Sequence, residues 1–401
     1  MNTDSGAISI PTAAGRARVH AGLATLLLLS AAHFFIDLYS GALSVMQPLL
    51  VDKLKLSLTQ AGLLGGLLVF SSSVTQPLYG YWSDVTRSRL FTALAPAVAG
   101  LFIAALGFAP SFSWALLLVF LGGAGISSFH PQGSAWATAG MDRHKARWMA
   151  FFISSGTLGI ALSPSAFSLW IGRFGFEQAI WAALPGIVMS VLLLTAMPVP
   201  ERAAARAGKS FDLAPLKAVW QPLLLLFLGV FIRSIVQVTY TQFLALYLHR
   251  ERGFPLQHAA LVLTVYLTMG AIGGFVGGHL SDRFGARRVM MVSFLLSVPF
   301  MSVFFFVTQS WLGVLSLAVG GFVLYFTIPV NVTVAQQLVP SQAGTVSALM
   351  MGFAWGTAGM IFIPLTGWVS DHSSLHFALS MLLSFPLLGY IVTKKLPKEI
   401  G

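Results

Sequence analysis

The sequence of 401 residues contains no cysteine, and only 9% of its residues are charged. The absence of cysteine excludes disulfides and thiolate metal sites. The shortage of charge accompanies 56% hydrophobic residues and a mean hydropathy of +0.82, far from the composition of soluble domains. We therefore expect most of the chain to lie inside a membrane.

Sequence motifs for several kinds of chemistry are also missing. There is no GxxxxGK[ST] phosphate loop, no HExxH and no Ser/His/Asp signature, which argues against an ATP-driven pump and against an enzyme. We predict no cofactor and no metal. A net charge of +11 would suit nucleic acid, but its distribution, described below, indicates membrane orientation instead. Nucleic acid is not an expected partner.

Twelve apolar runs are long enough to cross a hydrocarbon core, which takes roughly 20 helical residues. Backbone groups in lipid must bond internally, and no alternating strand pattern competes, so the sequence predicts an all-α membrane protein with twelve transmembrane helices. The predicted spans are 22–50, 59–82, 90–109, 113–138, 147–171, 178–198, 219–248, 259–280, 288–308, 312–338, 343–369 and 375–393.

The two halves of the chain repeat each other at a distance of roughly 200 residues. Gly156-Thr157-Leu158-Gly159 recurs as Gly356-Thr357-Ala358-Gly359, and Gly80–Asp84 recurs as Gly278–Asp282. Such repeats build transporters with a substrate site between the halves, near the bilayer midplane. The repeated glycines predict close helix packing where helices slide. The predicted parts are an N-terminal tail (1–20), two six-helix bundles (21–198 and 219–393), a linker (199–218) and a C-terminal tail (394–401).

Basic residues predict the orientation of the chain. Of the 23 Lys and Arg residues, the loops opposite the termini hold Lys53, Lys55, Arg173, Arg250 and Arg252, and nearly all others lie on the side of the termini. The positive-inside rule therefore places both termini in the cytoplasm. An alternative reading of Ala21–Ala32 is a cleaved signal peptide, but the apolar run continues and the repeat needs this span.

Formal charge near the centre of a span is confined to Asp37 and Arg233, at equivalent positions in the repeat. Each costs at least about 2.5–3.5 kcal/mol on insertion, so both are candidates for function. They are expected to form an ion pair across a cavity or to await a ligand group; a purely structural pair is the alternative. His33 lies one turn before Asp37, and we predict that the two carry protons, although His33 also suits a structural hydrogen bond.

Polar residues beside helix-breaking prolines extend the predicted substrate site. His130 and Gln132 flank Pro131, with Phe129 as an apolar wall, and Pro329 repeats this arrangement in the tenth span. A satisfied interior histidine is the alternative for His130. The full predicted substrate set is Arg233, Gln237, Tyr240, Phe129, His130, Gln132, Gln76, Tyr325 and Asn331.

The loop from Gly278 to Arg288 resembles the GxxxDRxGRR signature of the major facilitator superfamily, and Gly80–Arg89 is a degenerate copy. The resemblance implies a cytoplasmic latch that holds the outward-facing state. Its residues here are Gly80, Asp84, Gly278, Asp282, Arg283, Gly285 and Arg287.

A narrower resemblance is to fosmidomycin-resistance-type efflux proteins. It rests on HFxxD at His33–Asp37, QPxxGYWxD at Gln76–Asp84, SSxFHP at Ser127–Pro131 and SLTQAG at Ser57–Gly62. It implies export of a small antibiotic, such as a phosphonate, in exchange for protons. Where the family has Glu followed by an Arg-containing triplet, this chain has Gln132-Gly133-Ser134-Ala135, which places more weight on Asp37 and Arg233.

These observations predict a secondary transporter that works by alternating access and exports a small drug or metabolite against protons. We expect a monomer in the bacterial inner membrane, with a small-molecule substrate, protons and membrane lipids as partners. An uptake permease for a metabolite, and a membrane sensor that retains a transporter fold, are the alternatives.

Overall fold

The structure is a computed structural model that describes residues 13–86, 88–139, 145–197, 213–307 and 310–398. Its α-helices are α1 (Ala13–Leu54), α2 (Leu58–Val69), α3 (Gln76–Thr86), α4 (Leu90–Ala104), α5 (Phe112–Ala137), α6 (Lys145–Phe174), α7 (Ala183–Ala196), α8 (Ala214–Ala218), α9 (Trp220–Arg250), α10 (Leu256–Phe284), α11 (Ala286–Phe306), α12 (Ser310–Leu324), α13 (Thr327–Leu338), α14 (Ala343–Ser347), α15 (Trp355–Asp371), α16 (Leu375–Met381) and α17 (Ser384–Lys394). Short 3-10 turns are η2 (Ala105–Phe108), η3 (Glu177–Ala182) and η4 (Pro340–Gln342), and π-helical turns are η1 (Phe70–Val74) and η5 (Ala348–Ala354).

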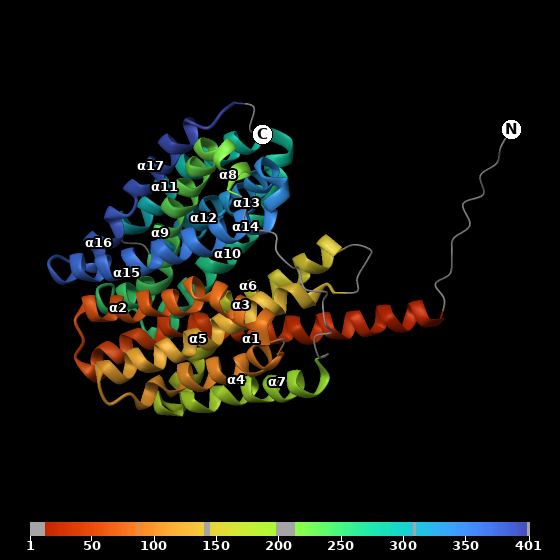
Figure 1. Cartoon of the computed structure of the whole chain (residues 1–401). Coiled ribbons are helices and arrows are strands. Elements are labelled where there is room, and N and C mark those ends of the chain that lie inside the picture. Colours follow the sequence, from red (N-terminus) through yellow and green to blue (C-terminus); the bar gives the residue numbers. More distant parts are fainter. Residues whose placement is uncertain (1–12, 87, 140–144, 198–212, 308–309, 399–401) are drawn as a thin grey trace.

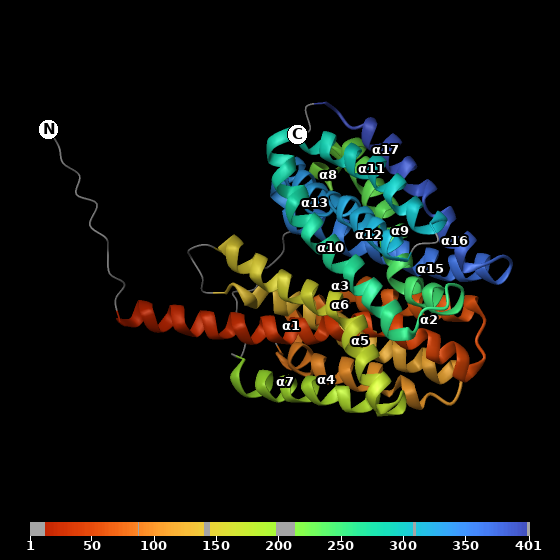
Figure 2. The same cartoon turned by 180° about the vertical axis from the view of Figure 1, so that it is seen from behind.

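The predicted all-α architecture is confirmed. Within the described ranges, 12 helical stretches are long and apolar enough to cross a membrane, and no strand is present. Figure 1 shows α1–α7 together in one half and α9–α17 in the other, with α2 and α15 side by side where the halves meet. Figure 2 shows the same division from behind, with α6 and α10 adjacent.

Helical structure extends into two of the predicted connecting segments. α1 begins at Ala13, inside the predicted tail, because Ala and Arg are strong helix formers, although its membrane-length apolar stretch begins at Gly22. The predicted linker contains the short helix α8, Ala214–Ala218. Residues 1–12, most of the predicted linker and the last three residues lie outside the described part of the chain.

The two prolines at equivalent positions act differently on their helices. Pro131 lies inside α5, which is continuous from Phe112 to Ala137. In the tenth span the helix is interrupted between Leu324 and Thr327, one turn before Pro329. Proline cannot donate to the carbonyl four residues earlier, and the Tyr325 carbonyl instead accepts from the N–H of Ile328 at 3.0 Å. The interruption places Tyr325 at the interface between the halves.

The repeated glycine motif packs on different partners in the two halves. In α6, a Cβ at Gly159 would lie 2.1 Å from the Phe34 carbonyl oxygen of α1, within the same half. In α15, a Cβ at Gly359 would lie 2.7 Å from Val69 of α2, in the other half. Gly62 of α2 faces the Ile363 carbonyl in the same way, at 2.7 Å. The α2–α15 contact therefore brings two helix backbones close together across the halves.

Polar contacts join the halves at the end that carries the α1–α2 and α9–α10 loops, which we call the closed end. The Asp371 carboxylate, at the end of α15, accepts from the N–H groups of Leu58 and Thr59 at 2.7 and 2.8 Å and from the Thr59 hydroxyl at 2.6 Å. Arg250 of α9 pairs with Asp52 of α1 at 2.5 Å. The first N–H groups of a helix lack intrahelical partners, so Asp371 caps the N-terminus of α2 from the opposite half.

The SLTQAG segment, Ser57–Gly62, lies at the closed end. Ser57 and Gln60 form a capping box at the start of α2, Thr59 bonds Asp371, and Gly62 permits the approach of α15. The segment therefore supplies the first-half side of the closed end.

We expect Gly159→Ala to destabilise the fold by about 1–3 kcal/mol, the usual cost of overpacking. Alanine in a helix normally gains up to about 1 kcal/mol over glycine, so the sign of the change tests the close approach of α6 to α1. Thermal unfolding in detergent measures it. Gly344→Ala is the control because no neighbour lies within 4 Å of its Cβ position, and equal behaviour of the two variants would contradict the packing.

Candidate functional site

A cavity of about 480 Å³ lies between the halves, where the repeat predicts the substrate site. Its wall comes from α1, α2, η1 and α6 of the first half and from α9, α10, α13, α15 and the α12–α13 interruption of the second. Most of the lining is apolar. The polar lining residues are Asp37, Ser40, Ser72, Ser154, Thr157, Gln237, Thr241, Gln242 and Tyr325.

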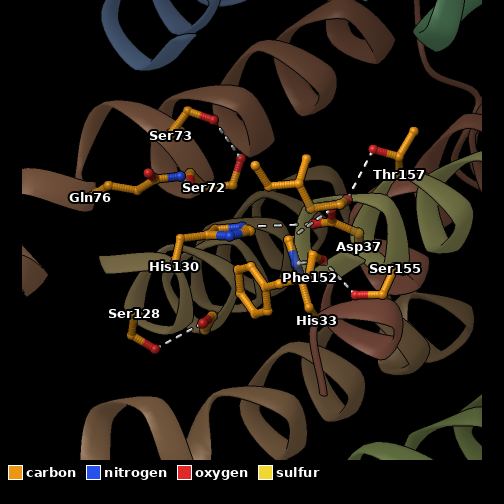
Figure 3. Close-up of polar contacts among 12 residues, drawn as sticks. His33, Asp37, Ser72, Ser73, Gln76, Ser128, His130, Phe152, Ser155 and Thr157 are labelled. Atoms are coloured by element: carbon orange, nitrogen blue, oxygen red, sulfur yellow. Dashed lines mark hydrogen bonds and ion pairs between the residues drawn. The ribbon is translucent and has the colours of Figure 1, made fainter. Parts of the chain in front are cut away.

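Two imidazoles bracket the carboxylate on the first-half wall of the cavity (Figure 3). His33 Nε2 lies 3.4 Å from Asp37 Oδ2, and His130 Nε2 lies 3.7 Å from Asp37 Oδ1. His33 Nδ1 lies 2.9 Å from the carbonyl oxygen of Phe152. We call His33, Asp37 and His130 the carboxylate cluster.

Three helices build the carboxylate cluster. His33 and Asp37 share one face of α1 because they are four residues apart. His130 comes from α5. The α6 backbone closes the cluster at Gly156, where a Cβ would lie 2.4 Å from His33 Nε2 and 2.5 Å from Asp37 Oδ2. The Phe152 ring stacks on His33 at 4.3 Å between centroids, which shields the pair from water on that side.

The side chains of the cluster are close enough to form ion pairs. The nitrogen and oxygen atoms of its members lie within 4.8 Å of one another, a spacing that a metal ion could also use. Each imidazole, however, faces a different carboxylate oxygen. One carboxylate shared by two imidazoles can accept and release protons without any other ion.

The predicted ion pair between Asp37 and Arg233 is absent. Asp37 is paired with imidazoles of its own half, while Arg233 donates to Gln237 and, at 3.0 Å, to Ser234. Arg233 is only 4% exposed, its Nε has no hydrogen-bond partner, and none of the described carboxylates pairs with it. The side chain lies beside Tyr325 and Tyr266. The arginine is thus buried behind the second-half wall of the cavity, with no counter-charge among the described residues.

Gln237 and Tyr325 are the members of the predicted substrate set that line the cavity. Gln237 accepts from Arg233 and so connects the buried cation with the cavity. The hydroxyls of Tyr325 and the neighbouring Tyr266 are buried beside Arg233. The Asn331 amide nitrogen is buried without a hydrogen-bond partner among the described residues. The second half therefore surrounds the cation with neutral polar groups.

The remaining members of the substrate set occupy other places in this conformation. Phe129 and Tyr240 are fully buried inside their halves, and Tyr240 donates to the Leu379 carbonyl at 3.1 Å, so neither forms a cavity wall. Gln132 donates to Ser83 at 2.8 Å instead of facing the cavity. His130 faces Asp37, and Gln76 donates to the Ser72 carbonyl at 3.0 Å. The positions of the four first-half residues follow from α5 and α3 packing inside that half, and Tyr240 lies inside the second half as part of α9.

Among the described residues, the second-half part of the predicted latch makes no ion pair with the first half. Asp282 is exposed, and the part of the chain that is described contains no ion-pair partner for it. Arg283 lies over the Phe284 ring, and Arg287 donates to the Lys394 carbonyl at 2.7 Å, within the same half. Gly285 has φ 89°, which explains the glycine. Gly278 lines the cavity, Gly80 lies beside Pro131, and the Asp84 side chain lies outside the described atoms.

The sequence did not reveal three contributors to these sites. Gly156 was predicted only as a packing glycine, although it shapes the carboxylate cluster. Phe152 contributes through its backbone carbonyl, and a pattern of side chains does not predict such a contact. Asp371 ends a span like many loop acids, and only its position opposite α2 distinguishes it.

Two six-helix halves with a cavity between them are typical of secondary membrane transporters. The chain belongs to the Major Facilitator Superfamily, whose family model matches residues 29–364 and 226–399. It is 28% identical to the Fosmidomycin resistance protein of Escherichia coli (strain K12), over 94% of both chains. It is 31% identical, over 91% of both chains, to YfnC of Bacillus subtilis (strain 168), an uncharacterized transporter of this type.

The fold is also that of a solved bacterial homolog of the human lysosomal transporter Spinster, in an inward-facing and occupied conformation. The TM-score is 0.80 at 16% identity, covering 96% of this chain and 97% of the other. The protein is thus a multi-pass secondary transporter.

Proposed function

We propose that the protein exports a small anionic compound, fosmidomycin or a similar metabolite, across the bacterial inner membrane in exchange for protons. The observation that carries this proposal is Arg233, a buried cation without a counter-charge that reaches the cavity through Gln237. The similarity to the Fosmidomycin resistance protein supports a phosphonate as the first compound to test.

The environment of Arg233 suits an anion. A buried charge without a partner costs several kcal/mol, and a bound anionic group would offset this cost. Guanidinium binds phosphonate, phosphate and carboxylate groups through paired hydrogen bonds. A ligand in the cavity would first meet Gln237 and Tyr325, and rotation of Gln237 would expose the guanidinium.

The carboxylate cluster is the proposed proton site, with Asp37 and His33 as its core. Asp37 lines the same cavity as Gln237, so substrate and proton share one compartment. A ligand whose anionic group is held at Arg233, on the opposite wall, would fill the cavity and remove water from the cluster, and loss of water disfavours a charged imidazole. Binding of substrate would therefore release a proton, which is the coupling that exchange requires.

The distribution of Lys and Arg supports cytoplasmic termini, so the closed end would face outward. The structure would then be the inward-facing state. The exposed Asp282 supports this assignment, since the implied latch would be released in that state. We propose that the transporter works as a monomer, because each chain contains both halves of the cavity.

The test is uptake of labelled fosmidomycin into everted membrane vesicles that are acidified inside. We expect uptake that collapses with the pH gradient, and an at least tenfold loss in Arg233→Gln, since hydrogen bonds to a charged group contribute about 1.5–3 kcal/mol. Arg173→Gln, at an exposed arginine outside both the cavity and the latch, is the control. Uptake that is the same with and without the pH gradient, or that is unchanged in Arg233→Gln, would contradict the proposal.

A further inference from the structure

The contact between His33 and Phe152 determines where the first imidazole carries hydrogen. A backbone carbonyl can only accept, so His33 Nδ1, at 2.9 Å from the Phe152 oxygen, must carry a proton and donate it. In a neutral imidazole, the other nitrogen then has a lone pair and no hydrogen. That nitrogen, Nε2, is the one that faces Asp37 Oδ2 at 3.4 Å.

Two bare acceptors do not attract each other, so a proton must lie between His33 and Asp37. If Asp37 is ionised, His33 Nε2 carries the proton, and if His33 is neutral, Asp37 carries it. In both cases the pair holds one proton and has no net charge, which avoids the large cost of an isolated buried ion. Gly156 fixes this arrangement because the α6 backbone prevents either side chain from moving toward α6.

His130 differs from His33 in its distance from Asp37, in its exposure and in its hydrogen bonding. Its Nε2 is 3.7 Å from Asp37 Oδ1, beyond hydrogen-bond distance, and its side chain is 23% exposed against 9% for His33. The structure gives it no carbonyl acceptor comparable to that of Phe152 within the described residues. It is therefore the member of the cluster that can gain and lose a proton without breaking a hydrogen bond.

We propose that the carboxylate cluster keeps one resident proton between His33 and Asp37 and exchanges a second proton at His130. In the exchange step, the Nε2–H bond of protonated His130 breaks, the electron pair stays on the nitrogen, and the proton passes to water in the cavity. His130 is then a coupling residue and not a substrate contact. This inference rests on the proposed proton exchange, and it specifies which group performs it.

No other described titratable side chain faces the cluster. α1 contributes His33 and Asp37, and α5 contributes His130. α6 presents Gly156 together with the neutral hydroxyls of Ser155 and Thr157, and the neighbouring Ser72, Ser73 and Gln76 are neutral as well (Figure 3). Any proton exchanged near Asp37 must therefore use these three groups.

The test is nitrogen-15 NMR of histidine-labelled protein in lipid nanodiscs between about pH 5 and pH 8. Chemical shifts of imidazole nitrogens report whether each carries hydrogen. His33→Gln and His130→Gln assign the two residues among the nine histidines. We expect a His33 signal that stays constant across this range, with Nδ1 protonated and Nε2 sharing a proton. We expect the His130 signal to change between its charged and neutral forms.

The variant Asp37→Asn separates the two sites further. Without the carboxylate, the His33 signal should become pH-dependent, and this comparison identifies His33 even if His33→Gln does not fold. A His33 Nε2 that is unprotonated beside an ionised Asp37 would overturn the inference, and so would a His130 signal that never changes. A cluster spectrum that changes when a chelator is added would show a bound metal ion and would also overturn it. The NMR measurement does not depend on transport. It therefore tests the proton positions even if the protein does not export fosmidomycin.

Discussion

Gly156→Ala is expected to abolish proton-driven transport although it adds a single methyl group. The added carbon would lie 2.4 Å from His33 Nε2 and 2.5 Å from Asp37 Oδ2, closer than atoms can approach. Because the surrounding α6 backbone packs on α1, the side chains of the pair must move, and the shared proton loses its site. We expect at least a hundredfold loss of pH-driven fosmidomycin uptake in everted vesicles, since small displacements at a reacting pair cost about that much.

A matched variant distinguishes this effect from a general change in helix stability. Gly229 also lies inside a long helix, but its nearest neighbour is Asn331 Oδ1 at 3.8 Å, an ordinary contact. Gly229→Ala should therefore retain transport. The nitrogen-15 signal of His33 should change in Gly156→Ala and stay constant in Gly229→Ala. Full transport by Gly156→Ala would show that the cluster does not need its observed geometry.

Asp371→Ala is expected to shift the protein toward a state in which the closed end is open. The substitution removes the acceptor for the N–H groups of Leu58 and Thr59, and loss of such a cap costs about 0.5–2 kcal/mol. This contact exists only when the halves meet at the closed end. Its loss therefore destabilises that conformation alone. A change of 1.4 kcal/mol corresponds to about a tenfold shift in population.

Spin labels can measure this shift directly. The chain has no cysteine, so Arg173→Cys and His258→Cys would be the only labelling sites. Both residues are exposed at the closed end, one in each half. Electron–electron distance measurements should show a larger long-distance population in Asp371→Ala. Glu251→Ala is the matched control, because Glu251 caps α16 through Leu375 at 2.6 Å within its own half. An unchanged distance distribution in Asp371→Ala, or an equal shift in the control, would contradict the role of Asp371.

The fold could be predicted almost completely because lipid imposes a simple requirement. Each span must be long, apolar and helical, and these properties are visible in any window of the sequence. The exceptions were local. Ala13 begins a helix before the apolar run starts, and Pro329 interrupts the tenth span whereas Pro131 leaves the fourth continuous. Packing around each proline decides that difference, and a single sequence does not contain it.

The site could be predicted only where helical spacing fixes geometry. The four-residue spacing of His33 and Asp37 was sufficient to place them together, and the position of Asp37 in the repeat was sufficient to place it at the inter-half cavity. The partner of Asp37 from α5 depends on how two helices rotate against each other, which the repeat does not specify. Symmetry suggested Arg233 as the partner, but each charge is held by residues of its own half.

The close approach of α2 and α15 has a mechanical consequence. Gly62 and Gly359 let the two backbones touch where bulky side chains would otherwise interlock. The side chains that occupy this contact are few and compact, since Val69 lies against Gly359 and Pro364 lies against Gly66. We therefore expect the rate at which the protein changes its access to depend mainly on the hydrogen bonds of Asp371 and the Arg250–Asp52 ion pair at the closed end.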